Sequence, residues 1–369
     1  MPAPISRRIL MQGSTGAAAL SALPIAAQGA ADQNGVRTLI RLHLNENPHG
    51  PSDRAKQAMR AALDDGWAYD NEDALALRRV IAAKEGLKPE NIFICEGSTE
   101  LLKVAALLYA GNGKDMVAGL PTFLAMPQYA SRNGGQVKWA NLDAAHRLDL
   151  NAMEALVGSA TGAVYICNPN NPTGTVVDSG RLRSFVESVS KRALVVVDEA
   201  YIDLADDPDR TTMVDQVKLG RNVLISRTFS KIHGLAGLRV GYGLGRPDVI
   251  RRLEEMRVSV PNRMGLKAAM ASYQDSEFLD YSRSMVRGCV TYTCEFLKSM
   301  QLPYIPTEAN FVMFDTGGSS VDFALALRAK SIYVQPMTEP FNTWARVSMG
   351  RLEHMEAFAV AARAHFKKS

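Results

Sequence analysis

Residues 226–241 read S-R-T-F-S-K-I-H-G-L-A-G-L-R-V-G, and a short apolar run, Val223–Ile225, precedes them. This run is short and β-branched enough to be a buried strand. Lys231 therefore lies on the loop that leaves a strand of an expected α/β sheet. Folds of this kind bind their ligands at the carboxyl ends of the strands, so the loop is a candidate ligand site.

The groups that neighbour Lys231 in sequence suit a phosphate. Thr228 and Ser230 supply hydroxyls and Arg239 supplies a guanidinium, which together could hold a dianion. An amine beside a phosphate cradle is the combination that pyridoxal 5′-phosphate (PLP) requires. A basic surface loop is the alternative, because serine, lysine and arginine are common in loops. Taken alone, this stretch leaves both interpretations open.

The composition is that of an ordinary globular protein. The 369 residues are 47% hydrophobic and 22% charged, which allows a large core and, by length, two domains. The net charge of +4 is small and includes no run of five like charges, so nucleic acid is not expected as a main partner. The four cysteines form no C-x-x-C pair and the six histidines lack metal-ligand spacing, so we expect free thiols and no metal.

The N-terminus differs in kind from the rest of the chain. Arg7 and Arg8 begin it, and an uncharged, mildly apolar stretch follows that ends in small residues at 27–31. This pattern is typical of a twin-arginine signal peptide, which directs export of a folded protein. We predict a signal peptide over residues 1–30, a periplasmic protein and no other membrane segment. A cytoplasmic protein with a disordered leader and an uncleaved anchor are the alternatives.

Apolar strands alternate with helical patterns across residues 91–245, which indicates βαβ units and a mainly parallel sheet. Polar residues follow several of these strands directly, as in the Asp198–Tyr201 segment. The expected strands are 91–95, 116–118, 161–167, 193–197 and 223–225.

A smaller α+β unit is expected after this sheet. Its helices are predicted at 266–281, 285–300 and 353–367, and its strands at 304–314, 332–334 and 344–349. We predict a large PLP-binding domain over 66–264 and a small domain over 265–369, with an N-terminal segment over 31–65 that joins the small domain. A cleft between the two domains is a natural place for a substrate.

Six motifs stand in order along the chain: L-N-E-N-P-x-G near residue 44, G-S-T-E at 97, N-P-T-G at 171, D-E-A-Y at 198, S-K-I-H-G-L-A-G-L-R at 230 and R-V-S-M-G at 346. Together they resemble the fold type I PLP-dependent aminotransferases, and most closely the histidinol-phosphate aminotransferase group. The resemblance covers nearly everything after residue 40.

The resemblance implies a role for each matching residue. Lys231 would carry the PLP aldimine and shuttle a proton, Asp198 would pair with the ring nitrogen, and Tyr201 would bond the phenolic oxygen. Other cofactor contacts are implied for Asn171 (phenolic oxygen), Phe123 (ring stacking) and Ser98, Thr99, Thr228, Ser230 and Arg239 (phosphate). Tyr69 would reach the phosphate from a neighbouring subunit, which implies a homodimer.

The substrate residues are less uniform. Arg346 resembles the arginine that binds a substrate carboxylate or phosphate. Asn47 is a further candidate contact, although its chemistry favours a structural role in which it satisfies backbone groups at a domain seam. Gln335 stands where the histidinol-phosphate enzymes usually carry a second arginine, and Arg263 stands where they have small or apolar residues. We therefore expect Gln335 or Arg263 to recognise a different side chain of a small-molecule substrate.

The resemblance implies a ping-pong transfer of an amino group between an amino acid and an oxo acid or related carbonyl compound, as part of amino-acid metabolism. A PLP-dependent lyase, racemase, decarboxylase or amino-acid oxidase on the same fold is the main alternative. A non-catalytic binding protein is a third, disfavoured because Lys231 and Asp198 are both present.

Overall fold

The structure is a computed structural model that describes residues 39–69, 72–257 and 259–367. The chain forms two compact units, and the predicted signal peptide lies outside the described residues. Within the described residues, the larger unit comprises Asn47–Met285 and Pro306–Asn310, and the smaller comprises residues 39–46, Val286–Ile305 and residues 311–367. This division differs from the predicted boundaries: residues 47–65 and 265–285 belong to the larger unit.

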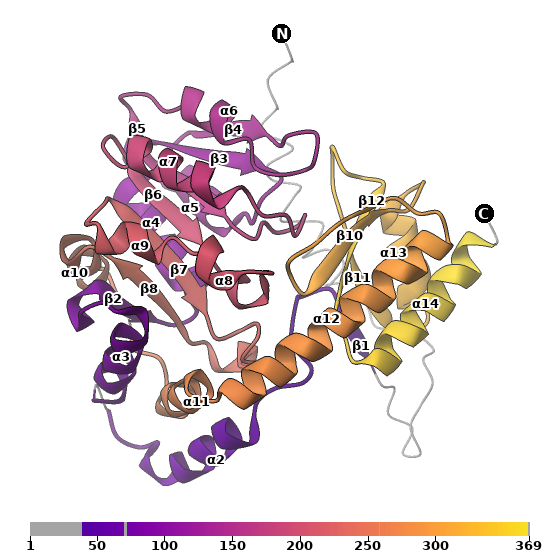
Figure 1. The fold of residues 1–369 in the computed structure, drawn as a ribbon, viewed down its shortest axis with the longest axis horizontal. Helices are drawn as coiled ribbons and strands as arrows, with labels where there is room; N and C mark the ends of the chain where they lie inside the picture. The colour runs from indigo at the N-terminus through magenta and orange to yellow at the C-terminus, as the bar shows by residue number, and fades with distance from the viewer. Residues whose placement is uncertain (1–38, 70–71, 258, 368–369) are drawn as a thin grey trace. The chain divides into compact units, whose positions relative to one another are not determined.

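The larger unit contains a seven-stranded sheet (Figure 1) with the strand order β2-β8-β7-β6-β5-β3-β4. The strands are β2 (Ile92–Cys95), β3 (Asp115–Leu120), β4 (Val137–Asn141), β5 (Thr161–Cys167), β6 (Leu194–Asp198), β7 (Val223–Thr228) and β8 (Gly241–Gly245). From β7 to β4 all pairs are parallel, while β8 runs antiparallel to both of its neighbours. The prediction of a mainly parallel α/β sheet is confirmed.

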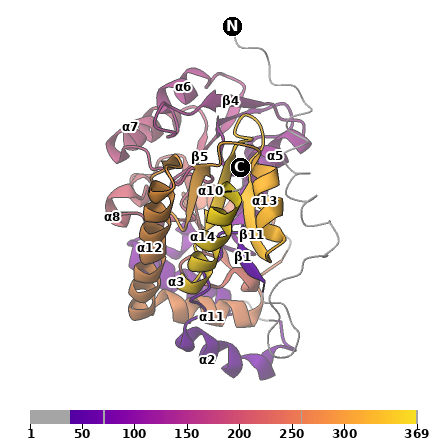
Figure 2. The ribbon, with the colours of Figure 1, turned by 90° about the vertical axis from the view of Figure 1, so that its right-hand side faces the viewer.

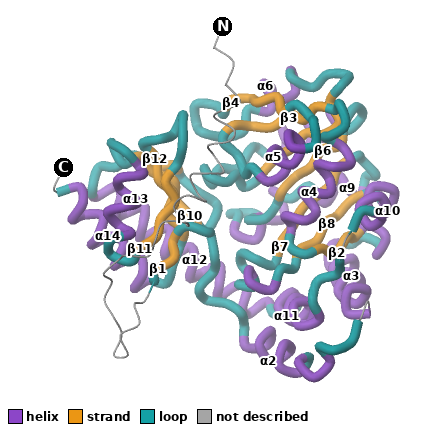
Figure 3. Tube along the Cα trace, turned by 180° about the vertical axis from the view of Figure 1, so that it is seen from behind, coloured by secondary structure: helices purple, strands orange, loops and turns teal. Residues whose placement is uncertain are grey.

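Helices cover both faces of this sheet, as the two opposite views in Figure 1 and Figure 3 show. The helices of the larger unit are α2 (Asp53–Ala61), α3 (Glu72–Glu85), α4 (Ser98–Tyr109), α5 (Ala125–Arg132), α6 (Leu150–Ala155), α7 (Ser179–Val189), α8 (Pro208–Thr211), α9 (Val214–Lys218), α10 (Pro247–Glu255) and α11 (Arg263–Tyr273). Its 3₁₀ turns are η1 (Leu63–Asp65), η2 (Pro89–Asn91), η3 (Ile202–Leu204) and η4 (Ala236–Leu238).

The central strands are buried on both faces, which explains their continuous apolar runs. In β6, Leu194 and Val196 belong to one core cluster, and Val195 and Val197 belong to the other. Successive side chains of a strand point to opposite faces, so the two clusters occupy opposite sides of the sheet.

The smaller unit has a five-stranded sheet with the order β1-β11-β12-β10-β9. Its strands are β1 (Ile40–Leu42), β9 (Tyr304–Ile305), β10 (Phe311–Asp315), β11 (Ile332–Pro336) and β12 (Trp344–Ser348). Its helices are α13 (Ser320–Arg328), α14 (Leu352–Phe366) and the C-terminal part of α12 (Ser276–Ser299). Figure 2 shows these helices over one face of the sheet.

Two local predictions were wrong, and one further strand was missed. The helix expected over 266–281 breaks at Gln274, and α12 starts at Ser276, where the Asp275 carboxylate accepts a hydrogen bond from the Phe278 amide at 3.3 Å. The strand expected over 304–314 is two strands, because residues 306–310 cross into the larger unit. The glycine-rich β8 was not predicted as a strand.

No helix in the described part of the chain is both long enough and apolar enough to cross a membrane. The four cysteines are free, and three of them are buried. The free-thiol prediction is therefore confirmed.

Candidate active site

The Asp198 carboxyl lies at the carboxyl end of β6 and is almost completely buried. Its Oδ2 accepts a hydrogen bond of 2.9 Å from the Tyr165 hydroxyl, while its buried Oδ1 has no partner of good geometry within the described residues. Burial raises the pKa of Asp198 to about 6, and interactions with the Tyr165 and Ser226 hydroxyls, the Ala200 amide and the charge of Lys231 oppose this effect. A buried carboxylate oxygen without a partner fits a ligand that brings its own N–H group, such as a pyridinium.

Lys231 follows β7 by three residues, and its Nζ lies 5.4 Å from the centre of the Tyr201 ring. Tyr201 follows β6, and its hydroxyl lies 3.5 Å from the Asn171 side-chain nitrogen. The structure thus brings together the lysine and the two predicted partners of the phenolic oxygen.

The predicted phosphate cradle has two halves. Ser98 and Thr99 begin α4, whose first backbone amides and positive dipole end suit an anion. Gly97 precedes them with φ +74°, and a Cβ there would overlap the Arg239 guanidinium, which shows how closely backbone and cation approach. Position 97 therefore requires glycine. The backbone amides of α4 and the Arg239 guanidinium are two kinds of donor that lie close together here.

The second half of the cradle follows β7. The Thr228 hydroxyl donates to Ser230 Oγ at 2.9 Å and accepts from the Ser230 amide at 3.1 Å, and both side chains are buried. Arg239 Nη1 lies 3.5 Å from Ser230 Oγ. The predicted phosphate residues are thus adjacent, and together with Asp198 and Lys231 they fit PLP.

The Asn47 side chain forms its hydrogen bonds within the protein. Its amide nitrogen donates to the Ile232 carbonyl at 2.8 Å and to Ser282 Oγ at 2.6 Å, and its oxygen accepts from the His49 amide at 3.1 Å. These bonds brace the loop just after Lys231, so Asn47 supports that loop and has no amide hydrogen left for a substrate.

His233 has a structural environment. It is buried, and its Nδ1 lies 2.8 Å from Ser272 Oγ, with the Phe229 ring centroid 4.7 Å away. Burial lowers the pKa of His233 to about 4, so the ring is neutral at pH 7. This agrees with a supporting role in the loop.

Phe123 lies on the loop after β3 and packs against the core at the same edge of the sheet. The parallel strands β3, β5, β6 and β7 all end there, so Phe123 shares this edge with Asn171, Asp198 and Lys231. Its stacking role remains a prediction.

Arg263 begins α11 and is held by acidic residues. Its Nη1 donates to the Asp65 carbonyl at 3.2 Å and lies 3.5 Å from the Asp65 carboxylate, and its Nε lies 3.6 Å from that of Asp73. This pairing ties α11 to η1 and α3, which argues against the predicted role in substrate recognition. Tyr69, on the loop before α3, is fully exposed in the single chain.

Arg346 and Gln335 both lie in the smaller unit. They occupy directly opposite positions on the antiparallel strands β12 and β11, so their side chains share one face at a Cβ separation of about 5 Å. Arg346 Nη2 donates to the His43 carbonyl at 2.8 Å, and its guanidinium lies over the Phe311 ring at 5.3 Å. The Gln335 amide thus faces Arg346 at the position where the resemblance implies a second arginine.

Sequence reasoning missed Tyr165. It lies inside the apolar strand β5, where a tyrosine reads as core, and only the pairing of β5 with β6 reveals its contact with Asp198. No cluster of histidine, cysteine or acidic residues in the described ranges could hold a metal ion.

Comparison with known proteins identifies the family. Residues 37–361 match the family model described as aminotransferase class I and II. The chain therefore belongs to this family, and the prediction of a PLP-dependent aminotransferase of fold type I is confirmed.

Within this class, several similar proteins are named histidinol-phosphate aminotransferase. A histidinol-phosphate aminotransferase of Moorella thermoacetica is 38% identical over 333 residues, which cover 89% of this chain and 86% of that protein. One of Symbiobacterium thermophilum is 36% identical and covers 89% and 91%. The crystal structure of the Sinorhizobium meliloti enzyme in complex with PLP superposes with a TM-score of 0.83 at 27% identity, covering 89% of this chain and 92% of that one.

Proposed function

We propose that this chain uses PLP to transfer an amino group between an amino acid and an oxo acid or related carbonyl compound. The observation that carries the proposal is Asp198, a buried carboxylate with one oxygen committed to Tyr165 and the other available to a ligand. It lies at the same sheet edge as Lys231 and the phosphate cradle.

Each group of residues has a distinct task. When bound, PLP supplies an aldehyde that forms a Schiff base with an amine and a ring that accepts the electron pair released at the substrate Cα. Lys231 would supply the resident amine and would move the proton at the substrate Cα. Asp198 would keep a proton on the ring nitrogen, and Tyr201 and Asn171 would bind the phenolic oxygen. The α4 N-terminus, Thr228, Ser230 and Arg239 would hold the phosphate.

The substrate is the finer part of the proposal. Arg346 offers a planar fork for one anionic group, and Gln335 opposite it offers a neutral amide. A phosphate monoester would lose a charge-assisted hydrogen bond at that position, worth about 1.5–3 kcal/mol. We therefore infer substrates with a single carboxylate and a neutral or hydrogen-bonding side chain. Histidinol phosphate is the second candidate, because the similar proteins are named for it.

An anaerobic absorbance titration tests the function. Adding donor amino acids to the PLP-loaded protein should convert the visible band that depends on Lys231 into the near-ultraviolet band of the aminated cofactor. A matched Lys231→Ala protein should not convert. Persistence of the visible band with every donor, or turnover that requires oxygen, would contradict amino transfer and favour the lyase or oxidase alternative.

A homodimer is also proposed. Leu63, Trp67 and Tyr69 are 61%, 87% and fully exposed within one short segment, an arrangement that suits burial by a partner subunit. Mixing Lys231→Ala and Tyr69→Ala proteins tests it. If Tyr69 acts across the interface, hybrid dimers contain one intact site and recover activity. If it acts within its own chain, they do not.

Export by the twin-arginine route is proposed from Arg7, Arg8 and the small residues that follow. Cell fractionation should find the mature protein in the periplasm. An Arg7→Lys, Arg8→Lys double variant that is still exported would contradict this route.

A further inference from the structure

Two charged residues lie directly behind the cofactor-binding residues. Asp198 and Ser226 are paired across β6 and β7, and the Glu199 amide donates to the Ser226 carbonyl at 2.8 Å. Because side chains alternate along a strand, Asp198 and Thr228 face one side of the sheet, and Glu199 and Arg227 face the other. The core agrees, since Leu194 and Val196 belong to the first side and Val195 and Val197 to the second.

Glu199 and Arg227 form a buried ion pair that ties the two strand ends together. Arg227 Nε donates to Glu199 Oε2 at 3.0 Å, and the residues are 8% and 1% exposed. The other two guanidinium nitrogens of Arg227 donate to Glu85 Oε1 at 2.8 Å and to Thr212 Oγ1 at 2.9 Å. All three nitrogens of the fork are therefore in use, which a lysine could not reproduce.

The carboxylates have further donors. Glu199 accepts from the Met213 amide at 2.7 Å and from the Thr212 hydroxyl at 2.9 Å, and Glu85 accepts from the Tyr273 hydroxyl at 2.9 Å. These donors come from the end of α11 and from the segment between α8 and α9, while the acceptor Glu85 ends α3. A buried charge network with its hydrogen bonds satisfied fixes its members rigidly.

We propose that Glu199 and Arg227 are positioning residues: their ion pair sets the spacing of the β6 and β7 ends, and with it the placement of Asp198 and Thr228. This rests on the proposed function, in which Asp198 meets the ring nitrogen and Thr228 meets the phosphate of PLP. Neither Glu199 nor Arg227 touches the cofactor, since both side chains lie on the opposite face of the sheet.

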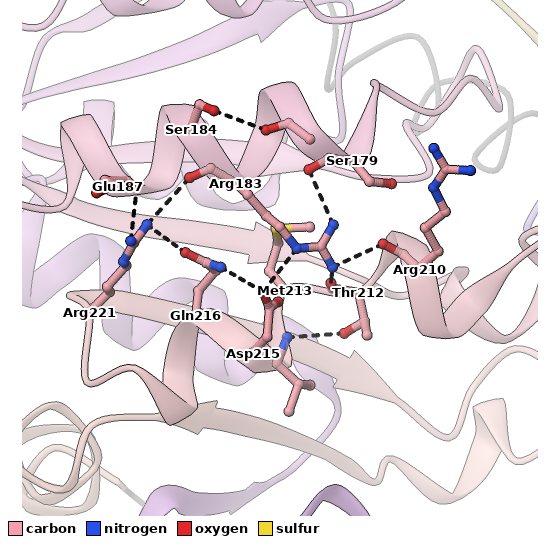
Figure 4. A network of polar contacts seen from close by, with 12 residues as sticks. Ser179, Arg183, Ser184, Glu187, Arg210, Thr212, Met213, Asp215, Gln216 and Arg221 are labelled. Carbon is pink, nitrogen blue, oxygen red and sulfur yellow. Dashed lines mark hydrogen bonds and ion pairs between the residues drawn. The ribbon is translucent and has the colours of Figure 1, made fainter.

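The chain offers a matched control pair in Arg183 and Asp215. Figure 4 shows that Arg183 also spreads its guanidinium over a carboxylate and backbone carbonyls, with its Nε donating to Asp215 Oδ2 at 2.9 Å. This pair lies nearer the surface, with side chains 30% and 44% exposed, and among the described residues it meets the Glu199–Arg227 network only at Thr212, whose carbonyl accepts from Arg183 Nη2 at 3.1 Å. Arg227→Lys is thus matched by Arg183→Lys, and Glu199→Gln by Asp215→Asn.

Hydrogen–deuterium exchange of the protein without cofactor gives the first readout. Peptides that cover residues 195–201 and 224–231 should exchange faster in Arg227→Lys and Glu199→Gln than in the wild type and both controls. Unchanged exchange of these peptides in both Arg227→Lys and Glu199→Gln would overturn the proposal. Arg227→Lys is the milder change and carries the test if Glu199→Gln does not fold.

The affinity for added PLP gives the second readout, measured by fluorescence titration below every variant's melting temperature. We expect Arg227→Lys and Glu199→Gln to bind PLP about tenfold to a hundredfold more weakly than the wild type, since small displacements of positioned groups have effects of that size. The pH midpoint of the bound cofactor's absorbance should shift as well, through Asp198. If exchange is faster but the PLP affinity and the pH midpoint of absorbance equal those of the controls, Glu199 and Arg227 have only a structural role. This result would contradict the positioning proposal. A wild type that fails to bind PLP would instead refute the proposed function, and exchange alone would then decide whether the pair sets the strand ends.

Discussion

We propose that the cofactor side of the larger unit and the strand surface around Arg346 in the smaller unit solve different recognition problems. Around Asp198 and Lys231, side chains are buried and bonded to one another, and a charged pair lies behind them on the other face of the sheet. Arg346 is buried as well, but Gln335 opposite it is half-buried and stands where the resemblance implies a second arginine. A cofactor of fixed shape needs every one of its partners in place, whereas a substrate side chain can be exchanged through one position on a strand surface.

Replacing Lys231 should have the largest effect on the half-reaction, and it tests the cofactor side of this comparison. Lys231→Ala should slow the half-reaction roughly 10⁴-fold, because it removes the amine that moves the proton. Single-turnover absorbance measures this, with the exposed Lys191→Ala as control. Turnover that survives the change would show that the loop does not carry the chemistry.

Asp198→Asn should lower the half-reaction rate by about 10²–10³-fold, as for loss of one preorganised charged group. An amide cannot hold a proton on the ring nitrogen as a carboxylate does. Asp215→Asn is the control of matched chemistry. Equal rates in both variants would remove Asp198 from the cofactor's partners.

The same substitution has an opposite effect on the stability of the cofactor-free protein. Burial raises the pKa of Asp198 from 3.8 to about 6, so its protonated form stabilises the fold below pH 4, and this stabilisation is lost as the pH rises through 6. Asp198→Asn should therefore stabilise the cofactor-free protein by roughly 3 kcal/mol at pH 7 and hardly at all at pH 4. Urea unfolding at both pH values measures it, and a variant less stable than the wild type at pH 7 would contradict the account.

On the substrate side, Gln335→Arg should raise kcat/KM for a phosphate monoester about tenfold to a hundredfold, since hydrogen bonds between charged groups are worth roughly 1.5–3 kcal/mol. The exposed Gln57→Arg adds the same charge elsewhere and should change little. An equal gain from both would indicate a general electrostatic effect, not recognition at the sheet face.

Tyr165→Phe should have the smallest effect, a loss of about threefold to tenfold in the half-reaction, for one hydrogen bond. Without the Tyr165 hydroxyl, the pKa of Asp198 should rise further above its ordinary value, because that bond stabilises the carboxylate. The pH dependence of PLP-loaded protein absorbance reports this. Tyr109→Phe serves as control, and identical midpoints in both variants would show that Tyr165 does not tune Asp198.

The sheet could be predicted because apolar strands are local patterns, and the resemblance implied the cofactor roles of the polar residues that follow those strands. Lys231, Asp198 and Asn171 each follow an apolar run, so a parallel sheet brings them to one edge. The partner residues were not visible in this way: Tyr165 looks like core, and the Glu199–Arg227 pair depends on which residues of β6 and β7 face each other. Arg263 was assigned to the substrate because its acidic partners, Asp65 and Asp73, are distant in sequence.

The specificity ratio of the wild type tests the central claim most directly. We would measure kcat/KM of the PLP-loaded enzyme for histidinol phosphate and for a set of donors with one carboxylate and a neutral side chain that includes glutamine and the aromatic amino acids. The account predicts turnover with at least one carboxylate donor and a higher kcat/KM for that donor than for histidinol phosphate. A clear preference for histidinol phosphate would contradict the altered substrate face and assign this chain the activity for which its relatives are named.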